Sequence, residues 1–449
     1  MLLGNKLQAV LDRAVADGVA PGFQLVVFDK EAVLFNGVSG LALVPSPDTP
    51  EGEKFRPEHA GWLASCAKIT MAMVVLHVLE RGLNNYGLTL RDLDSHDALI
   101  RVLPEFRPSS GHLVTKVIED FDGIGPDKKK VMKLRDQKTR VTLRMLLTHS
   151  AGAAYWWSHP LANELYHPSD GSVPHKSLPY LTGNISDYDI PAVAEPGTTF
   201  TYGHASDWLG QFAVRATGRN LRQLFRDIFF DPLGIKPSEL DLHLSPAIAS
   251  NVRPIHVRNA SSDARDPAMR FDATDAMIYH TAGQPPPGKA YYAGGCLFGN
   301  AQGYAKVLQA VLRKDPKILK RTTWDMAFAD DFAERGIKVP RPLYKTSSPF
   351  FSSDVPEFAR STAKIDAEGM NLLSCIVAKA PTLSGRPEGS FGWAGLTNSY
   401  YFVDPVNNIG SIVHMQLFPF FDPRCIETRD EIEKTIYEHL NSPRASKYQ

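Results

Sequence analysis

The tetrapeptide Ser65-Cys66-Ala67-Lys68 places a hydroxyl and an amine three residues apart. On a helix, residues at this spacing share a face, so the Lys68 amine would lie beside the Ser65 hydroxyl. A serine hydroxyl is a weak nucleophile at neutral pH and needs a base, and burial lets a lysine serve because it disfavours the ammonium form. The residues from Ile69 to Leu79 are almost all apolar and would supply that burial. The pair therefore predicts a nucleophilic serine with a lysine as its proton partner.

This spacing alone is a weak signal, because Ser-x-x-Lys arises by chance in a chain of 449 residues. It also fits a helix N-cap followed by a surface lysine. A helix that starts at Ser65 would direct free backbone N–H groups and the helix dipole at a developing oxyanion. Elements farther along the chain must decide between the two interpretations.

A second candidate is Tyr202, in the segment PGTTFTYGH at residues 196–204, just before the helical sequence ASDWLGQFAVRATG. A tyrosine in a turn before a helix can direct its phenol into a cleft, where it can pass a proton between nucleophile and leaving group. The alternative is a half-buried aromatic residue with a satisfied hydroxyl.

The third element is the segment FGWAGL at residues 391–396. Small residues in a strand let a substrate carbonyl lie against the backbone. An N–H of this strand and the N–H of Ser65 can then form an oxyanion hole. Taken alone, the segment also fits an ordinary tight entry to a strand.

A sheet and a buried helix are expected to position these residues. Residues 23–40 contain two β-rich runs separated by Asp29-Lys30-Glu31, which predicts a hairpin, and residues 398–418 predict a strand, a turn and a second strand. Apolar spacing predicts helices at about residues 5–17, at 68–79 and at 431–440. The helix at 68–79 is apolar nearly all round and should be buried on most sides.

Strands at both ends of the chain with helical pieces between them predict an α/β (α+β) fold, an antiparallel sheet flanked by helices. Residues 1–85 and 286–449 would form one discontinuous sheet domain, and residues 86–285 a mainly helical insertion domain with long loops. The stretches 107–139 and 157–190 are interpreted as insertions. The lysine run of the first is most simply a solvated surface, and the second is a candidate substrate lid.

The overall composition excludes several function classes. Hydrophobic residues make up 43% and charged residues 22%, which is typical of a globular protein. The 49 Lys and Arg balance the 49 Asp and Glu, which removes the basic footprint of a nucleic-acid binder and any strong attraction to an anionic membrane. We therefore expect partners that are small and weakly charged.

No segment predicts export or a metal site. The chain has no run of about 18 apolar residues, and its N-terminus reads as an amphipathic helix, so we expect a soluble, cytoplasmic protein. The cysteines lie far apart, at 66, 296, 375 and 425. They support neither a disulfide framework nor a structural metal, and no cofactor is expected.

In this order, the three elements resemble the serine β-lactamase and penicillin-binding-protein superfamily. The similarity is greatest to the class C β-lactamase-like esterases and transesterases, and it covers most of the chain. It implies a β-lactamase/transpeptidase-like fold in which Ser65 is the acyl-enzyme nucleophile, Lys68 its proton partner and Tyr202 the general base and acid. The N–H groups of Ser65 and Leu396 are implied as the oxyanion donors. Four further segments carry the resemblance: PGFQLVVFDKEAVLFNGVSG, VTLRMLLTHSAG, EPGTTFTYGHASDWLG and YYAGGCLFGNAQGYAKVL.

Two departures from the family pattern bear on the activity. A class C β-lactamase would carry Tyr-x-Asn and Lys-Thr-Gly, where this chain has Tyr202-Gly203-His204 and Trp393-Ala394-Gly395. The lysine of the third motif helps to hold an anionic β-lactam, so its loss predicts weak β-lactam hydrolysis. Trp-x-Gly is similar to the esterase and acyltransferase branch, and Trp393, Ala394 and Gly395 are assigned to substrate binding. His204 is also a substrate-site candidate: it either replaces the Asn in orienting Lys68 or the substrate carbonyl, or is structural.

Several other residues have two interpretations. His149 invites a Ser-His-Asp reading, but Ser150 lacks the Gly-x-Ser-x-Gly pattern, so His149 is predicted to be a buried, hydrogen-bonded turn residue. Cys66 is interpreted as a small core residue, because the resemblance places the reactive group at Ser65. Aromatic residues could line an acyl pocket or simply pack in the core. These are Tyr155, Trp156, Trp157, Tyr291 and Tyr292.

The sequence therefore predicts a cofactor-free serine esterase or acyltransferase that acts on a carboxylic ester or thioester through an acyl-enzyme on Ser65. Its partners would be a small-molecule acyl substrate and an alcohol or amine acceptor, with a role in small-molecule metabolism. The alternatives are a β-lactam hydrolase and a catalytically silent binding protein with the same fold.

Overall fold

Strands from both ends of the chain form one sheet. The computed structural model describes residues 2–47, 49–242, 244–258, 269–271, 289–339 and 368–442. In chain order, the strands of the sheet are β1 (Gly22–Asp29), β2 (Val33–Leu43), β3 (Glu53–Lys54), β11 (Glu368–Met370), β12 (Ile376–Ala378), β13 (Phe391–Gly395), β14 (Ser399–Asp404) and β15 (Ile409–His414). Their spatial order is β11-β12-β13-β14-β15-β1-β2-β3, and neighbouring strands are antiparallel.

Both strand pairs expected from the sequence are present. β1 and β2 form the N-terminal hairpin, whose turn is closed by Asp29 Oδ1 accepting from the N–H groups of Glu31 and Ala32 at 2.7 and 2.6 Å. β14 and β15 form the C-terminal pair, and β15 continues onto β1 with Gln24 opposite His414. The two ends of the chain are thus joined in the middle of the sheet.

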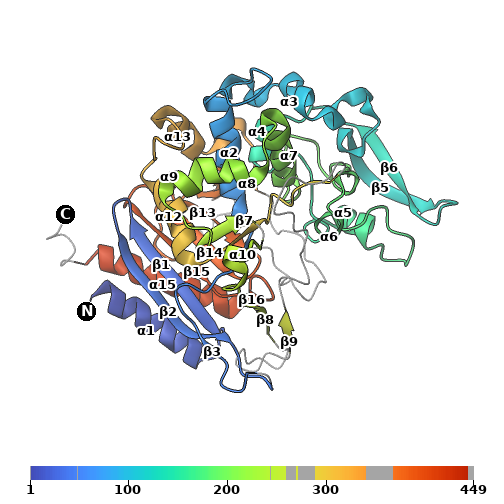
Figure 1. The fold of residues 1–449 in the computed structure, drawn as a ribbon. Helices are drawn as coiled ribbons and strands as arrows, with labels where there is room; N and C mark the ends of the chain where they lie inside the picture. The colour runs from blue at the N-terminus through green and yellow to red at the C-terminus, as the bar shows by residue number, and fades with distance from the viewer. Residues whose placement is uncertain are drawn as a thin grey trace.

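Helices cover both faces of this sheet. On one face, α1 (Leu3–Ala16) and α15 (Pro423–Leu440) lie side by side, and α1 buries Leu7, Val10, Leu11 and Ala14 in the same core as Leu25 and Val27 of β1 (Figure 1). Leu25 and Val27 alternate with Val26 and Phe28, which enter the core on the other face. That core contains α2 (Ala67–Glu80) and α12 (Ala301–Leu312).

α2 is buried nearly all round, as its composition predicts. Every residue from Ala67 to Leu79 is buried except His77. The run lacks Gly and Pro, and the helix ends at Arg81, just before Gly82 with a φ of +64°. The amine of Lys68 is enclosed with the rest of the helix and must find polar partners inside the protein.

The middle of the chain is helical, but it also contains strands that were not expected. Residues 107–139 include the antiparallel hairpin of β5 (Lys116–Ile124) and β6 (Lys130–Asp136), which extends from the upper right of Figure 1. Most of its residues are exposed or half-buried, so its sequence lacks the apolar alternation of a core strand. Lys128 and Lys133 are exposed, as expected of a solvated surface, whereas Lys130 pairs with Glu164 at 2.6 Å.

The remaining elements surround this core. The α-helices are α3 (His96–Val102), α4 (Leu143–Leu147), α5 (Pro160–Tyr166), α6 (Pro179–Thr182), α7 (Ala205–Thr217), α8 (Leu221–Phe225), α9 (Asp231–Leu233), α10 (Pro246–Ala249), α13 (Arg321–Phe328) and α14 (Asp331–Arg335). One small sheet has the order β4 (Gly61–Ala64), β10 (Leu297–Gly299), β7 (Leu240–Leu242), and another the order β16 (Leu417–Phe418), β8 (Ile255–Val257), β9 (Met269–Phe271). Short 3₁₀ turns occupy Leu90–Asp94, Pro104–Phe106, Pro108–Ser110, Leu113–Thr115 and Ile185–Asp187, and a π-helical turn occupies Arg226–Phe230.

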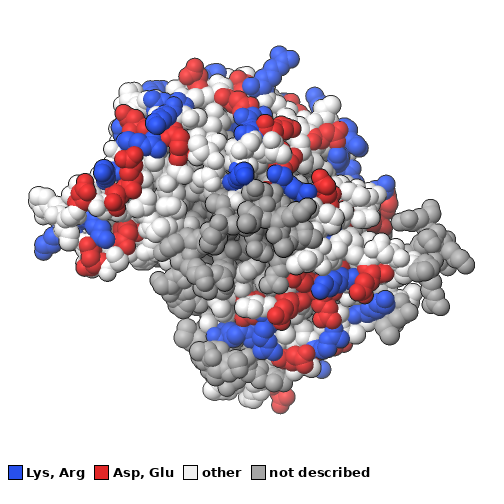
Figure 2. Space-filling view, turned by 180° about the vertical axis from the view of Figure 1, so that it is seen from behind, with Lys and Arg blue, Asp and Glu red and all other residues white. Residues whose placement is uncertain are grey.

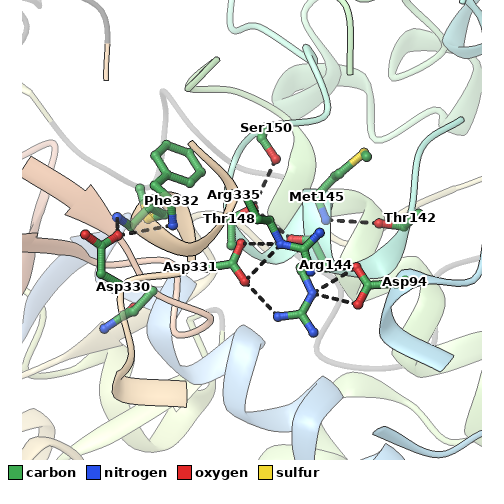
Figure 3. A network of polar contacts seen from close by, with 12 residues as sticks. Asp94, Thr142, Arg144, Met145, Thr148, Ser150, Asp330, Asp331, Phe332 and Arg335 are labelled. Carbon is green, nitrogen blue, oxygen red and sulfur yellow. Dashed lines mark hydrogen bonds and ion pairs between the residues drawn. The ribbon is translucent and has the colours of Figure 1, made fainter. Parts of the chain in front are cut away.

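An ion-pair network joins α4 to α14 (Figure 3). Arg144 pairs with Asp331 at 2.7 Å and with Asp94 at 2.9 Å, and Arg335 pairs with the same two carboxylates. The Asp331 side chain is only 3% exposed, so the two arginines neutralise a buried charge. Just beyond α14, Lys338 forms a parallel bridge with Thr199. The network therefore anchors a segment that pairs with the chain leading to Tyr202.

Charges of both signs are mixed on the surface. On the face seen in Figure 2, the described Lys and Arg side chains alternate with Asp and Glu and form no large patch of one sign. Within the described residues, no helix combines the length and the apolar character needed to span a membrane.

Candidate active site

Ser65 lies in the turn between β4 and α2. Cys66 N–H donates to Leu63 O and Lys68 N–H donates to Ser65 O, both at 3.1 Å, so the chain enters the helix directly after the serine. Ala64 has a φ of +48°, a left-handed conformation that alanine rarely adopts. The turn fixes the direction of the Ser65 side chain at some cost in backbone strain.

The Ser65 hydroxyl contacts both residues expected to exchange protons with it. Lys68 Nζ donates to Ser65 Oγ at 3.0 Å, and the Tyr202 hydroxyl donates to the same oxygen at 2.8 Å. Lys68 Nζ also donates to the Gly294 carbonyl at 2.8 Å and lies 5.0 Å from the centre of the Tyr202 ring. Because one oxygen lies within hydrogen-bond reach of an amine and a phenol, it can lose and regain a proton without rearrangement.

Tyr202 is held by its backbone as well as its ring. Its carbonyl accepts from Tyr155 N–H at 3.0 Å and from the Ser158 hydroxyl at 2.6 Å. Gly203 allows this close packing, because a Cβ at that position would lie 1.6 Å from the Ala153 carbonyl oxygen. The glycine of the Tyr-Gly-His motif is therefore required by the approach of the 153–158 segment.

Trp393 occupies the position of the third-motif lysine and contacts Tyr202 instead. Its indole Nε1 donates to the Tyr202 hydroxyl at 3.4 Å. The indole also stacks on the ring of His149, with 6.1 Å between centroids and 6° between planes. A neutral N–H thus faces the phenol where a class C β-lactamase would present a cation.

His149 is buried and lies in a turn, as predicted, with a φ of +52°. Its hydrogen bonds are made by the backbone, since His149 O accepts from Thr201 N–H at 2.7 Å, and neither ring nitrogen has a partner among the described residues. The ring instead contacts Trp393 and the edge of Tyr202. Burial, and secondarily the charge of Lys68, hold the pKa of His149 at about 3, so the imidazole is neutral at physiological pH.

The aromatic candidates divide between the site and the core. Tyr155 covers Lys68, with its ring centre 5.3 Å from Nζ, and Trp157 stacks on Tyr155 and meets the edge of Tyr202. Trp156, which the sequence assigned to the substrate pocket, packs edge-on against His167 at 4.7 Å. Tyr291 is buried in the main core. Of the two adjacent tryptophans, Trp157 is the one that contacts Tyr202.

His204 contacts a carboxylate and two tyrosine rings. Its Nδ1 is 3.2 Å from Asp207 Oδ2, and its ring meets the edges of Tyr155 and Tyr188. Asp207 Oδ1 accepts from Gly294 N–H at 2.9 Å. Sequence reasoning missed Asp207 and Gly294. The i, i+3 spacing of His204 and Asp207 at the start of α7 was the signal that could have identified Asp207.

The third segment lies against the chain that carries Ser65. A Cβ on Gly395 would lie 2.3 Å from the Leu63 carbonyl oxygen and 3.2 Å from Cys66 Sγ, so only glycine permits this approach. Leu396 follows directly after the end of β13. The Ala394 side chain belongs to the core under α1 and α15, which leaves its backbone as the part available to a substrate.

The thiol of Cys66 lies next to Ser65 in sequence but faces the core. Cys66 is fully buried and burial raises the pKa of its thiol, which confirms it as a core residue rather than a nucleophile. Within the described residues, no group of three or more His, Cys, Asp and Glu side chains could hold a metal ion.

The chain is similar to known acyltransferases and esterases. The family model described as Beta-lactamase matches residues 7–434. Monacolin J acid methylbutanoyltransferase of Aspergillus terreus is 28% identical over 375 residues, which cover 84% of this chain and 81% of the relative. Esterase EstB of Burkholderia gladioli is 25% identical over 425 residues, which cover 90% of this chain and 87% of the relative.

The fold is also that of a solved structure. Unliganded simvastatin synthase (LovD) from Aspergillus terreus superposes with a TM-score of 0.73 and 23% identity, over 97% of this chain and 98% of that chain. This similarity confirms the predicted fold class, an antiparallel sheet flanked by helices with further helices inserted between its strands.

Proposed function

Because the chain belongs to the beta-lactamase family, we propose that it is a serine acyltransferase or esterase that works through an acyl-enzyme on Ser65. The observation that carries the proposal is the joint contact of Ser65 Oγ with Lys68 Nζ at 3.0 Å and with the Tyr202 hydroxyl at 2.8 Å. A helix cap or a surface lysine requires neither contact.

In the first step, Ser65 Oγ attacks the carbonyl carbon of an ester or thioester. The proton of Ser65 passes to the Lys68–Tyr202 pair as the Oγ–carbon bond forms. The bond from that carbon to the alcohol or thiol then breaks, and Tyr202 returns the proton to the leaving oxygen or sulfur. The acyl group remains on Ser65 as an ester.

In the second step, the hydroxyl of an alcohol or of water attacks the acyl-enzyme. Its proton passes to the same pair, the bond to Ser65 Oγ breaks, and Ser65 regains a proton. An alcohol gives a new ester and water gives a free acid, so both activities use one site. We propose that Tyr202 acts as general base and general acid, with Lys68 maintaining its supply of protons.

We propose that the oxyanion of each tetrahedral intermediate is held by the N–H groups of Ser65 and Leu396. Ser65 lies two residues before the first residue of α2, and Leu396 follows β13, whose Gly395 packs against Leu63 and Cys66. Two backbone donors converging on one oxygen stabilise the developing charge because they are already oriented.

We propose a small, uncharged acyl group as the substrate and an alcohol of small-molecule metabolism as the acceptor. The rings of Tyr155 and Tyr202 lie over the Lys68 amine, and Trp157 packs against both rings, so the aromatic surroundings favour apolar groups over charged ones. A methylbutanoyl group is the first acyl chain to test, because the fungal relative is a methylbutanoyltransferase. Trp393 replaces the cation that would bind a β-lactam carboxylate, so ester turnover should exceed hydrolysis of nitrocefin.

The test is intact-mass spectrometry of the full chain after mixing with a methylbutanoyl thioester. The expected result is a mass increase of one acyl group, mapped to Ser65 by peptide digestion, that disappears when a secondary alcohol is added and yields the new ester. Ser65→Ala should give no adduct. An adduct on another residue, or none on the parent with any member of a panel of esters and thioesters, would overturn the proposal.

A further inference from the structure

Lys68 is joined to a buried carboxylate through one glycine. The carbonyl of Gly294 accepts from Lys68 Nζ at 2.8 Å, and the N–H of the same residue donates to Asp207 Oδ1 at 2.9 Å. Both backbone groups of Gly294 are therefore fixed, one by the amine and one by the carboxylate. The Asp207 residue is 1% exposed, so its orientation is set by these protein contacts.

The glycine also lets the three polar groups come close together. A Cβ on Gly294 would lie 3.2 Å from Lys68 Nζ, 3.3 Å from Asp207 Oδ1 and 2.9 Å from the Tyr155 hydroxyl. The amine, the carboxylate and the phenol thus approach one point beside the Gly294 Cα. A side chain there would displace at least one of them.

Burial keeps four other titratable groups near this point uncharged at neutral pH. Burial raises the pKa of the Cys66 thiol on α2, of the Cys296 thiol before β10 and of the Tyr155 phenol. Burial holds the pKa of His149 at about 3. Tyr202 presents its ring to the amine. Asp207 is then the buried carboxylate that reaches the amine through Gly294.

His204 holds the second oxygen of that carboxylate. Its Nδ1 is 3.2 Å from Asp207 Oδ2, and its ring is fixed between Tyr155 and Tyr188, at 4.6 and 5.3 Å between centroids. Because His204 and Asp207 are both 1% exposed, neither can leave this arrangement without losing a buried contact.

We propose that Asp207 is a positioning residue for Lys68: oriented by His204, it places the amine on Ser65 through Gly294 and balances the charge of the ammonium form. The inference rests on the proposed function, since it concerns the proton partner of the acyl-enzyme serine. It assigns to His204 the orientation of Asp207 rather than a direct contact with Lys68 or substrate.

The charge of Asp207 is tested by Asp207→Asn in the full chain. The amide keeps an oxygen for Gly294 N–H but removes the negative charge, which favours loss of a proton from a neighbouring ammonium group. The rate of Ser65 acylation by a p-nitrophenyl ester is measured as kcat/KM from about pH 5 to 9. We expect the acid limb of the kcat/KM profile to move to lower pH by about 1 unit. We also expect kcat/KM at its optimum pH to fall about tenfold or more, because the amine loses its fixed position.

A matched control removes a buried carboxylate elsewhere. Asp404 is fully buried at the end of β14 and accepts from Tyr437, and Asp404→Asn should lower Tm without moving the acid limb. If Asp207→Asn is unfolded by circular dichroism, Gly294→Ala is measured instead, since its methyl group separates the amine from the carboxylate and should move the limb in the same direction. An acid limb unchanged or moved upward in the folded variant would overturn the inference. Absence of a Ser65 adduct on the parent would instead overturn the proposed function.

Discussion

Two serines near Tyr202 have different surroundings. Ser65 lies between two elements and contacts Lys68 and Tyr202. Ser150 follows α4, next to a histidine in sequence, yet its hydroxyl contacts the hydroxyl of Thr148 at 3.1 Å. The adjacent His149 turns its ring toward Trp393, because its φ of +52° reverses the chain at that point.

The difference shows that a base must reach the nucleophile in space rather than in sequence. His149 is adjacent to Ser150 but its ring nitrogens have no hydrogen-bond partner among the described residues. Tyr202 is 137 residues from Ser65 and is hydrogen-bonded to it. The Ser65 hydroxyl contacts an amine and a phenol, as the proposed proton transfer requires, whereas the Ser150 hydroxyl contacts only another hydroxyl among the described residues.

The sharpest test replaces each serine by alanine. Ser65→Ala should lower ester turnover by about 10³-fold or more, since no acyl-enzyme can form. Ser150→Ala removes one buried hydroxyl and should leave turnover within about threefold, with a stability loss of about 1 kcal/mol. Turnover and urea unfolding of both variants are measured together. Comparable activity in the two would mean that the functional contrast between the serines is wrong.

The proton partners come next in magnitude. Lys68→Met and Tyr202→Phe should each lower kcat by about 10² to 10⁴-fold with a much smaller effect on KM. Their effects should not multiply, because both residues act on one oxygen. Single-turnover acylation of the double variant measures this directly. Fully multiplicative losses would exclude a shared proton path.

The ion-pair network of α4, the helix that leads into the Thr148–Ser150 turn, should affect the free energy of unfolding rather than the rate of turnover. Arg144→Met leaves the carboxylate of Asp331 with half of its ion pairs, and we expect a loss of about 3 kcal/mol in unfolding free energy. The folded enzyme should keep kcat within about threefold. Arg144→Met combined with Asp331→Leu should recover part of the stability, because no unpaired buried charge remains there. A loss of kcat as large as that of Tyr202→Phe would place the turn in the catalytic machinery.

The last prediction concerns the pH dependence of stability and leaves turnover aside. The folded pKa of His149 is about 3, well below the usual value near 6.5. The unfolded chain therefore binds a proton that the folded chain does not, and stability falls as pH decreases from about 6.5 toward 3. His149→Asn, which tolerates positive φ, should flatten this decline by on the order of 1 kcal/mol per pH unit. His414, whose pKa is also about 3, keeps its own contribution and serves as an internal reference. Parallel stability curves for parent and variant would show that His149 is not the source.

The sequence predicted the elements whose pattern is strong. The apolar run after Lys68 corresponds to α2, the two runs on either side of Asp29-Lys30-Glu31 to β1 and β2, and the strand pair at 398–418 to β14 and β15. The contacts of Ser65 with Lys68 and Tyr202 could be predicted because three motifs occur in the order that is typical of one family. The domain boundaries at 85 and 286, and the lid at 157–190, stay predictions.

What the sequence did not predict depends on contacts between distant segments. The β5–β6 hairpin is mostly exposed, so no buried face marks its strands. The link from Asp207 to Lys68 passes through the backbone of Gly294, which carries no side-chain signal. The choice of Trp157 over Trp156 as the neighbour of Tyr202 is set by the packing of adjacent residues. The spacing of residue types within one segment does not determine which distant segments it contacts.

The pairing of β1 with β15 has a consequence for the order of folding. Gln24 lies opposite His414, so β1 cannot acquire this neighbour until nearly the whole chain has been synthesised. Until then its edge exposes unpaired N–H and C=O groups, and α2 lacks part of the sheet on which it packs. Pairings between such distant residues form slowly, because the loop must close before any contact repays the entropy. In the proposed mechanism Ser65 acts together with the segment after β13, whose Gly395 packs against Leu63 and Cys66. We therefore expect a nascent chain that lacks the C-terminal strands to form no acyl-enzyme.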